Sequence, residues 1–207
     1  MNYYYLTNIK NNFISNYGEI SYSTLMEKKS SFLCYIFNIS NEIEAKEAIN
    51  KIKNNYKDAR HVVYIYSYID NGNNVTRFDD DGEPQGTGTK AIYDMLDKEK
   101  ITNICIVIVR YFGGILLGAG PLSRTYLNVA KEGFNNCSKK ELYNYISKKF
   151  EFEYKFYDII KNRIDNFINE EIIKVIREDF GDKIFLTLNI ADIKIEEIET
   201  MIYDIIK

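Results

Sequence analysis

The sequence predicts an α+β protein with two domains, a larger one over residues 1–137 and a smaller one over residues 138–207. Segments with strand and helix periodicity alternate along the whole chain, which is typical of a mixed fold. A continuous β-branched run, ICIVIV at residues 104–109, indicates a strand covered on both faces. A polar stretch, NNCSKK at residues 135–140, separates two periodic halves and marks the expected boundary.

The first domain is expected to be a two-layer α/β domain, a mostly antiparallel sheet with its helices on one face. Its predicted elements are a hairpin of residues 18–27 and 31–39, a helix from residue 41, strands over 61–69 and 74–78, a helix over 90–100, a strand over 104–109 and a helix over 121–135. Asn41 and Glu44 suit a capping box, and Thr89 is the expected N-cap of the second helix. The run Asp70-Asn71-Gly72-Asn73 suits a hairpin turn.

The second domain has the predicted order β-α-β-β-α. Its elements are a strand over residues 147–154, a helix over 157–169, strands over 172–177 and 183–190, and a helix over 192–206. Alternating apolar residues indicate the strands, and Ile160, Ile164 and Phe167 have the spacing of one helix face.

The segment from Arg110 to Arg124, RYFGGILLGAGPLSR, predicts a strand that runs into a glycine-rich loop and then into a helix. Free backbone N–H groups and the positive end of a helix dipole make such a junction a natural anion site. Arg110 and Arg124 could flank a bound phosphate or carboxylate. The loop's freedom comes from Gly113, Gly114, Gly118 and Gly120. The alternative is that these glycines only allow tight packing of helix on sheet.

Two further elements contain candidate chemical groups. The acidic loop FDDDGEPQGTGTK, residues 78–90, offers Asp79, Asp80, Asp81 and Glu83 as oxygen ligands for a hard cation, although it lacks the EF-hand series. An acidic turn is the alternative interpretation. His61 is the only histidine of the chain and stands at the start of a predicted strand, so any imidazole catalysis must use it. A structural role is the alternative for His61.

Four separated motifs resemble the IMPACT/YigZ family and occur in the family's order over about the first two thirds of the chain. The motifs are Lys28-Lys29-Ser30-Ser31-Phe32, Ala59-Arg60-His61, Asp80-Asp81-Gly82-Glu83-Pro84-x-Gly86-Thr87 and Arg110-Tyr111-Phe112-Gly113-Gly114-x-x-Leu117-Gly118. The resemblance implies a first domain similar to the second domain of a small-subunit ribosomal protein and to domain IV of elongation factor G. It implies a smaller C-terminal ferredoxin-like domain similar to domain V of that factor.

Two loops depart from the family pattern. The family usually reads Gly-Thr-Ala-Gly where this chain has Gly86-Thr87-Gly88-Thr89, and Gly-Gly-Leu-x-Arg-Ala-Tyr where it has residues 120–126, GPLSRTY. Thr89 and Pro121 leave less backbone freedom than glycine, so the loop geometry is expected to differ. In the second domain the usual closing strand is missing or very short, which could open one sheet edge to a partner or to a second copy.

Composition narrows the function classes. A net charge of −3 over 207 residues counts against bulk coating of nucleic acid, although a local basic face remains open. Cys34, Cys105 and Cys137 are odd in number and widely spaced, so they predict core residues and neither a disulfide framework nor a zinc site. No apolar run approaches the ~20 residues that span a bilayer, and the N-terminus lacks signal-peptide features. A cytoplasmic protein without membrane contact is expected.

Two functions remain open. The first, which the resemblance favours, is a non-enzymatic protein that binds RNA, the ribosome or a translation factor, since the family's eukaryotic members regulate translation under amino-acid starvation by competing for a partner protein. Its contact residues would be Arg60, His61, Lys90, Arg110, Gly113, Gly114, Gly118, Gly120 and Arg124. The alternative is a small hydrolase or phosphate-handling enzyme with His61 as base and Asp80, Asp81 or Glu83 as acid or metal ligands. We predict no cofactor and no resident metal; a homodimer through the second domain is open.

Overall fold

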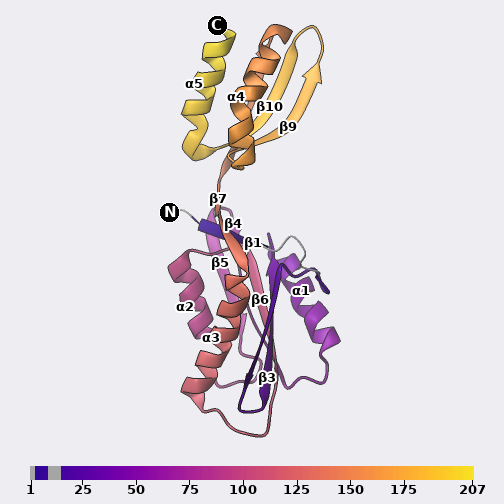
Figure 1. Cartoon of the computed structure of the whole chain (residues 1–207), viewed down its shortest axis with the longest axis vertical. Coiled ribbons are helices and arrows are strands. Elements are labelled where there is room, and N and C mark those ends of the chain that lie inside the picture. Colours follow the sequence, from indigo (N-terminus) through magenta and orange to yellow (C-terminus); the bar gives the residue numbers. More distant parts are fainter. Residues whose placement is uncertain (1–2, 9–14) are drawn as a thin grey trace. The chain divides into compact units, whose positions relative to one another are not determined.

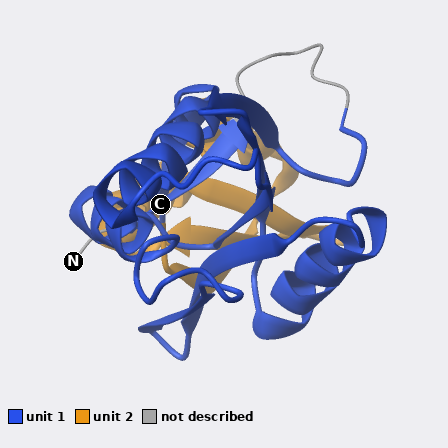
Figure 2. Ribbon diagram, turned by 90° about the horizontal axis from the view of Figure 1, so that it is seen from below, with its two compact units in different colours: residues 1–142 blue, residues 143–207 orange. Residues whose placement is uncertain are grey.

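The computed structural model describes residues 3–8 and 15–207 and divides the chain into two compact units, residues 1–142 and 143–207 (Figure 2). The division therefore lies at 142/143 and not at the predicted 137/138. The reason is that β7 (Cys137–Leu142), expected to be a linker, pairs antiparallel with β1 (Tyr3–Asn8) and stays in unit 1. No helix of the described residues is long and apolar enough to cross a membrane.

Unit 1 is built on a five-stranded antiparallel sheet in the order β2-β3-β6-β4-β5. The strands are β2 (Ser21–Glu27), β3 (Ser30–Asn38), β4 (His61–Asp70), β5 (Asn73–Asp79) and β6 (Ile104–Tyr111). Lys28 and Lys29 turn the first hairpin with φ angles of 45° and 66°. Asn71 and Gly72 turn the second hairpin with 48° and 80°. Two successive positive φ angles are typical of the two-residue turn whose twist matches the strands.

The helices of unit 1 lie on both faces of this sheet, so the predicted two-layer arrangement is wrong. Helices α2 (Lys90–Glu99) and α3 (Ala119–Asn135) cover one face, and α1 (Glu42–Asn55) covers the other (Figures 1 and 2). Strand β6 supplies alternate side chains to the two cores, for example Ile106 to one and Val107 to the other. A strand with no polar face requires cover on both sides, which is why its run is continuously apolar.

In unit 1 the N-cap residues of α1 and α2 are the predicted ones, Asn41 and Thr89, whereas α3 begins earlier than predicted. The expected cap forms with one change: the Glu44 N–H donates to Asn41 Oδ1 at 3.0 Å, but the Glu44 carboxylate accepts at 2.7 Å from the N–H of Ser40, the residue before the N-cap, and not from Asn41. Thr89 holds the N-cap position of α2, but its hydroxyl makes no capping bond. Helix α3 begins at Ala119, before the expected start at Pro121.

Unit 2 follows the predicted β-α-β-β-α order. It contains β8 (Tyr145–Phe152), a short 3₁₀ turn, α4 (Tyr157–Asn169), β9 (Ile173–Phe180), β10 (Ile184–Ala191), a second 3₁₀ turn and α5 (Ile195–Ile206). Its sheet is antiparallel, in the order β8-β10-β9. Apolar side chains from all three strands pack with α4 and α5 in one core.

The three cysteines are buried free thiols. Burial raises the pKa of Cys34 from 9.0 to about 12, and it raises the pKa of Cys105 and Cys137 as well. Since the thiolate is the reacting species, we expect a disulfide reagent such as DTNB at pH 8 to label Cys34 about a thousandfold more slowly in the native protein than in the unfolded chain, and to label Cys105 and Cys137 more slowly as well. Rapid release of thionitrobenzoate by native protein would show that at least one thiol is accessible.

Candidate functional site

Three side chains from three neighbouring strands form a row at one end of the unit 1 sheet. Arg110 of β6 lies opposite Phe32 of β3 on one side and opposite His61 of β4 on the other. Strand alternation directs this row to the face that α2 and α3 cover. Residues from three of the sequence motifs are thus brought side by side.

Glu83, from the loop between β5 and α2, forms an ion pair with Arg110, the central residue of this row. Its Oε1 accepts a hydrogen bond from Arg110 Nη1 at 2.5 Å and another from the Tyr126 hydroxyl at 2.7 Å. The side chains of Arg110 and Glu83 are only 5% and 3% exposed. Burial, and then the hydrogen bond to Glu83, raise the pKa of Tyr126, so its hydroxyl stays protonated and donates. The arginine charge is therefore compensated inside the protein.

His61 stands beside this network with one nitrogen directed to the loop. Its Nδ1 lies 2.8 Å from the backbone oxygen of Asp81. Because a carbonyl oxygen only accepts, Nδ1 carries the proton in the neutral ring and Nε2 is left as an acceptor. Nε2 lies 3.9 Å from Glu83 Oε2.

A cleft of about 220 Å³ opens above these groups. It is lined by Arg60, His61, Gly82, Glu83, Arg110, Phe112 and Leu116. The Arg110 guanidinium lies between two rings, 5.4 Å from the centre of Phe32 and 5.6 Å from that of Phe112. The network therefore forms the floor of the cleft and supports Phe112 at its edge.

Asp80 and Asp81 hold the acidic loop in place. Asp80 Oδ2 accepts from the Gly86 N–H at 2.6 Å, and Oδ1 accepts from the Gly88 N–H and the Thr89 hydroxyl at 3.0 Å each. Asp81 Oδ2 accepts from the Val62 N–H at 2.6 Å. Both carboxylates are thus engaged in folding the loop onto the sheet. No three His, Cys, Asp or Glu side chains of residues 3–8 and 15–207 gather in a way that could hold a metal ion.

The glycine-rich loop after β6 packs on the β2–β3 turn. The Gly113 N–H donates to Ser30 Oγ at 3.1 Å, and a Cβ on Gly113 would lie 2.0 Å from the carbonyl carbon of Lys29. Gly113 is therefore required for this close approach. Gly114 and Gly118 have φ angles of +83° and +79° and turn the chain into α3.

The structure separates two of the predicted contact residues from the cleft. Lys90 is exposed on α2, where it pairs with Asp94. Arg124 is exposed on α3, beside Gly120, and does not line the cleft. The predicted pair of flanking guanidiniums is therefore not formed, because Arg110 is turned inward to Glu83. Arg60, His61 and Arg110 do meet at the cleft.

We define the exposed rim of the cleft as Arg60, Phe112 and Leu116, which line it, together with Ile115, the chain neighbour of Leu116. Sequence reasoning named Arg60 as a contact residue but missed the three apolar members of the rim. The three apolar side chains are 36%, 43% and 83% exposed, and the Arg60 guanidinium lies 5.8 Å from the centre of the Phe112 ring. The available signal was the apolar pair Ile115-Leu116 inside a glycine-rich loop, where polar residues are the rule.

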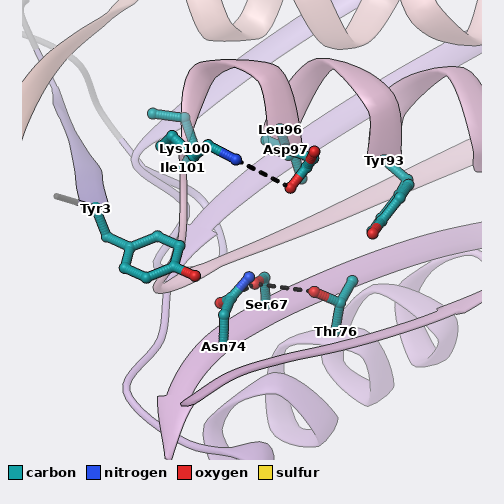
Figure 3. A pocket seen from close by; sticks show the side chains of 9 residues that line it. All are labelled: Tyr3, Ser67, Asn74, Thr76, Tyr93, Leu96, Asp97, Lys100 and Ile101. Atoms are coloured by element: carbon teal, nitrogen blue, oxygen red, sulfur yellow. Dashed lines mark hydrogen bonds and ion pairs between the residues drawn. The ribbon is translucent and has the colours of Figure 1, made fainter. Parts of the chain in front are cut away.

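A second hollow in unit 1 is bordered by α2 and by β4 and β5, and polar side chains that line it hydrogen-bond to one another (Figure 3). Its volume of about 10 Å³ is room for a single water molecule. Below it, Asn74 Oδ1 accepts from the hydroxyls of Ser67 and Thr102 at 2.7 Å each, and Ser67 Oγ accepts from Thr76 at 3.2 Å. We assign this cluster a structural role.

The fold and the site together define a class of mixed α/β protein. In this class, motifs far apart in the sequence meet at a buried network of Arg110, Glu83 and Tyr126 beneath a cleft. Residues 28–134 match the family described as the Impact N-terminal domain, and the chain belongs to the IMPACT family. This confirms the resemblance of the four motifs.

Relatives of this family cover the chain to different extents. The chain is 40% identical over 114 residues to the IMPACT family member YvyE of Bacillus subtilis, a match that covers 55% of this chain and about half, 52%, of that relative's length. It is 28% identical over 170 residues to an IMPACT family member of Haemophilus influenzae, covering 82% of this chain and 81% of the relative. A crystal structure of a hypothetical protein has a similar fold, with a TM-score of 0.60, 22% identity, and coverage of 98% and 92%.

Proposed function

We propose that this protein is a binding module of the translation apparatus that docks on RNA, the ribosome or a translation factor through the cleft rim, and that it regulates translation without turning over a substrate. The observation that supports this most is that the buried charged groups of the site serve to hold the fold together, whereas a different set of residues, the rim, faces solvent. The charges of Asp80, Glu83 and Arg110 have partners within the protein, although Arg110 Nε makes no hydrogen bond to the described residues, whereas the rim remains exposed.

The rim has the composition of an interface centre. Exposed apolar side chains next to an arginine are enriched at the energetically important positions of protein interfaces. Arg60 over the Phe112 ring would also suit an unpaired base or a phosphate of RNA. The buried network adjoins this surface, because the Arg110 guanidinium lies 5.6 Å from the centre of the Phe112 ring.

Family membership supports the choice of partner. The resemblance to the second domain of a ribosomal protein and to domains IV and V of elongation factor G is part of this proposal, and so is the cytoplasmic location that a role in translation requires. Fold similarity alone does not define a function, so the proposal depends on the rim residues.

One observation favours an enzyme as the second candidate. His61 Nε2 accepts and borders the cleft, which is the position of a general base. In an enzyme of this kind, His61→Gln would abolish turnover. In a binding module, the same variant would bind its partner with unchanged affinity.

Sedimentation with the organism's own ribosomes at low and moderate salt tests the proposal. We expect the double variant Arg60→Ala/Leu116→Asp to lower the affinity at least about tenfold, because two central contact groups are lost. Its matched control is Arg163→Ala/Ile159→Asp on α4, where Ile159 is 49% exposed and Arg163 is also on the surface. Arg110→Ala is unsuitable, since it leaves Glu83 buried without its cation.

Unchanged sedimentation of the rim variant, or equal loss by the control, would contradict the proposal. His61→Gln is expected to sediment like wild type, and loss of a measurable hydrolytic activity in that variant would favour the enzyme instead.

A further inference from the structure

The sheet of unit 2 has one face covered by helices and one face without them. Ile184, Leu186, Leu188 and Ile190 of β10 point to α4 and α5 and are fully buried. Both helices lie on that same side of β9 and β10 (Figure 1). The residues that alternate with these on β10 belong to the opposite face and are only half-buried: Phe185, Thr187 and Asn189.

The strand register arranges the opposite face, here called the open face, in three rows. Phe185 lies between Glu151 of β8 and Asp179 of β9. Thr187 lies between Lys149 and Arg177, and Asn189 lies between Ser147 and Lys174. An aromatic ring, hydrogen-bonding groups and cations thus share one face of the sheet, with a register shift between β10 and β9 at Thr187/Leu188.

The charge of the open face is opposite to that of its unit. Residues 143–207 contain ten Lys and Arg against fourteen Asp and Glu, so unit 2 is acidic as a whole. On the open face both carboxylates are already paired, Glu151 with Lys183 at 2.7 Å and Asp179 with Arg177 at 2.8 Å.

Two lysines of the open face have no carboxylate partner among the described residues. Lys149 Nζ lies 4.8 Å from the centre of the Phe185 ring, and Lys174 Nζ lies 4.2 Å from the centre of the Tyr145 ring. A lysine that rests on a ring can move to an anion at small cost, because an exposed cation–π contact contributes only about 0.5–1 kcal/mol. The same movement would uncover the ring.

We propose that the open face of unit 2 binds single-stranded RNA, with Lys149 and Lys174 on phosphates and a base stacked on Phe185. Side-chain amide and hydroxyl groups of Asn189, Thr187 and Ser147 are placed to contact sugars and base edges. A sheet face with aromatic rings and with cations that have no carboxylate partner suits unstacked bases, whereas a duplex keeps its bases inside. These residues are distinct from the cleft rim of unit 1, so the inference goes beyond the proposed function.

Fluorescence anisotropy of a labelled single-stranded RNA 12-mer with the full chain tests this surface. We expect Lys149→Ala/Lys174→Ala to weaken binding at least tenfold and to lower the slope of log K against log salt by about 1.4, since each phosphate contact on a single strand contributes about 0.7. Phe185→Leu is expected to weaken binding about fivefold or more with an unchanged salt slope, because it removes stacking only. The control Lys155→Ala/Lys207→Ala changes net charge equally at two exposed positions outside the open face and should bind like wild type.

Several outcomes would overturn the inference. Absence of RNA binding by wild type, or equal weakening by the control, would remove the open face as an RNA site. Equal competition by a polyglutamate peptide would assign it to an acidic protein segment. The anisotropy experiment with the 12-mer measures the open face through the Lys149 and Lys174 variants, and sedimentation with ribosomes measures the rim through Arg60→Ala/Leu116→Asp. Failure of the open face and failure of the rim are therefore distinguishable.

Discussion

Replacement of Glu83 by alanine is expected to lower the free energy of unfolding of unit 1 by about 3–5 kcal/mol, the usual cost of removing one partner from a buried ion pair. The variant leaves the Arg110 guanidinium, 5% exposed, without its anion, and it leaves the Tyr126 hydroxyl without its acceptor. Urea denaturation followed by circular dichroism measures the effect. Glu83→Gln keeps an oxygen for both donors, so a smaller loss of about 1–3 kcal/mol is expected.

An exposed ion pair provides the matched control. Asp94 pairs with Lys90 on the surface of α2, with the two side chains 57% and 63% exposed. Asp94→Ala should change the free energy of unfolding by no more than about 0.5 kcal/mol, because solvent screens such pairs. If Glu83→Ala were as mild as Asp94→Ala, the buried network would not stabilise unit 1.

The second large effect is expected at Gly113. A Cβ placed there would lie 2.0 Å from the carbonyl carbon and 2.1 Å from the carbonyl oxygen of Lys29, both rigid backbone atoms. Gly113→Ala must therefore push the glycine-rich loop away from the β2–β3 turn, at a cost of about 3 kcal/mol or more. Thermal unfolding of the variant, compared with wild type, gives the loss.

Gly114→Ala is the control for Gly113→Ala. No atom lies within 4 Å of a Cβ at Gly114, so the only cost is its φ of +83°, about 1–2 kcal/mol for an alanine. A Gly113 variant no less stable than the Gly114 variant would mean that the loop does not touch the turn. Because the displaced loop contains Phe112 and Leu116, Gly113→Ala is also expected to weaken partner binding.

Most elements of the fold could be predicted because their patterns are local. The hairpin turn at Asn71-Gly72 and the N-cap at Asn41 depend on neighbouring residues only. The layer arrangement was missed because an amphipathic helix such as α1 has an apolar stripe whichever face of the sheet it covers. The β1–β7 pair was missed because its strands are far apart in sequence and β7 carries polar residues.

The sequence was sufficient to predict which residues belong to the site, but not what each side chain contacts there. His61 and Arg110 become neighbours only through the register of β4 and β6, which no short motif encodes. Arg110 was expected to face a ligand, yet its partner Glu83 is supplied by a loop whose closure depends on Asp80. Tyr126, a helix residue with ordinary core spacing, gave no sign of its hydrogen bond to Glu83.

Site-specific photocrosslinking in living cells tests the central claim, that the cleft rim contacts the translation apparatus, most directly. A benzophenone side chain at Leu116, which is 83% exposed, is compared with the same probe at Ile159 of unit 2, which is 49% exposed. The account predicts that the probe at position 116 crosslinks to ribosomal RNA, a ribosomal protein or a translation factor, and that the probe at position 159 does not. Equal labelling from both positions, or products from position 116 that contain no component of translation, would contradict it.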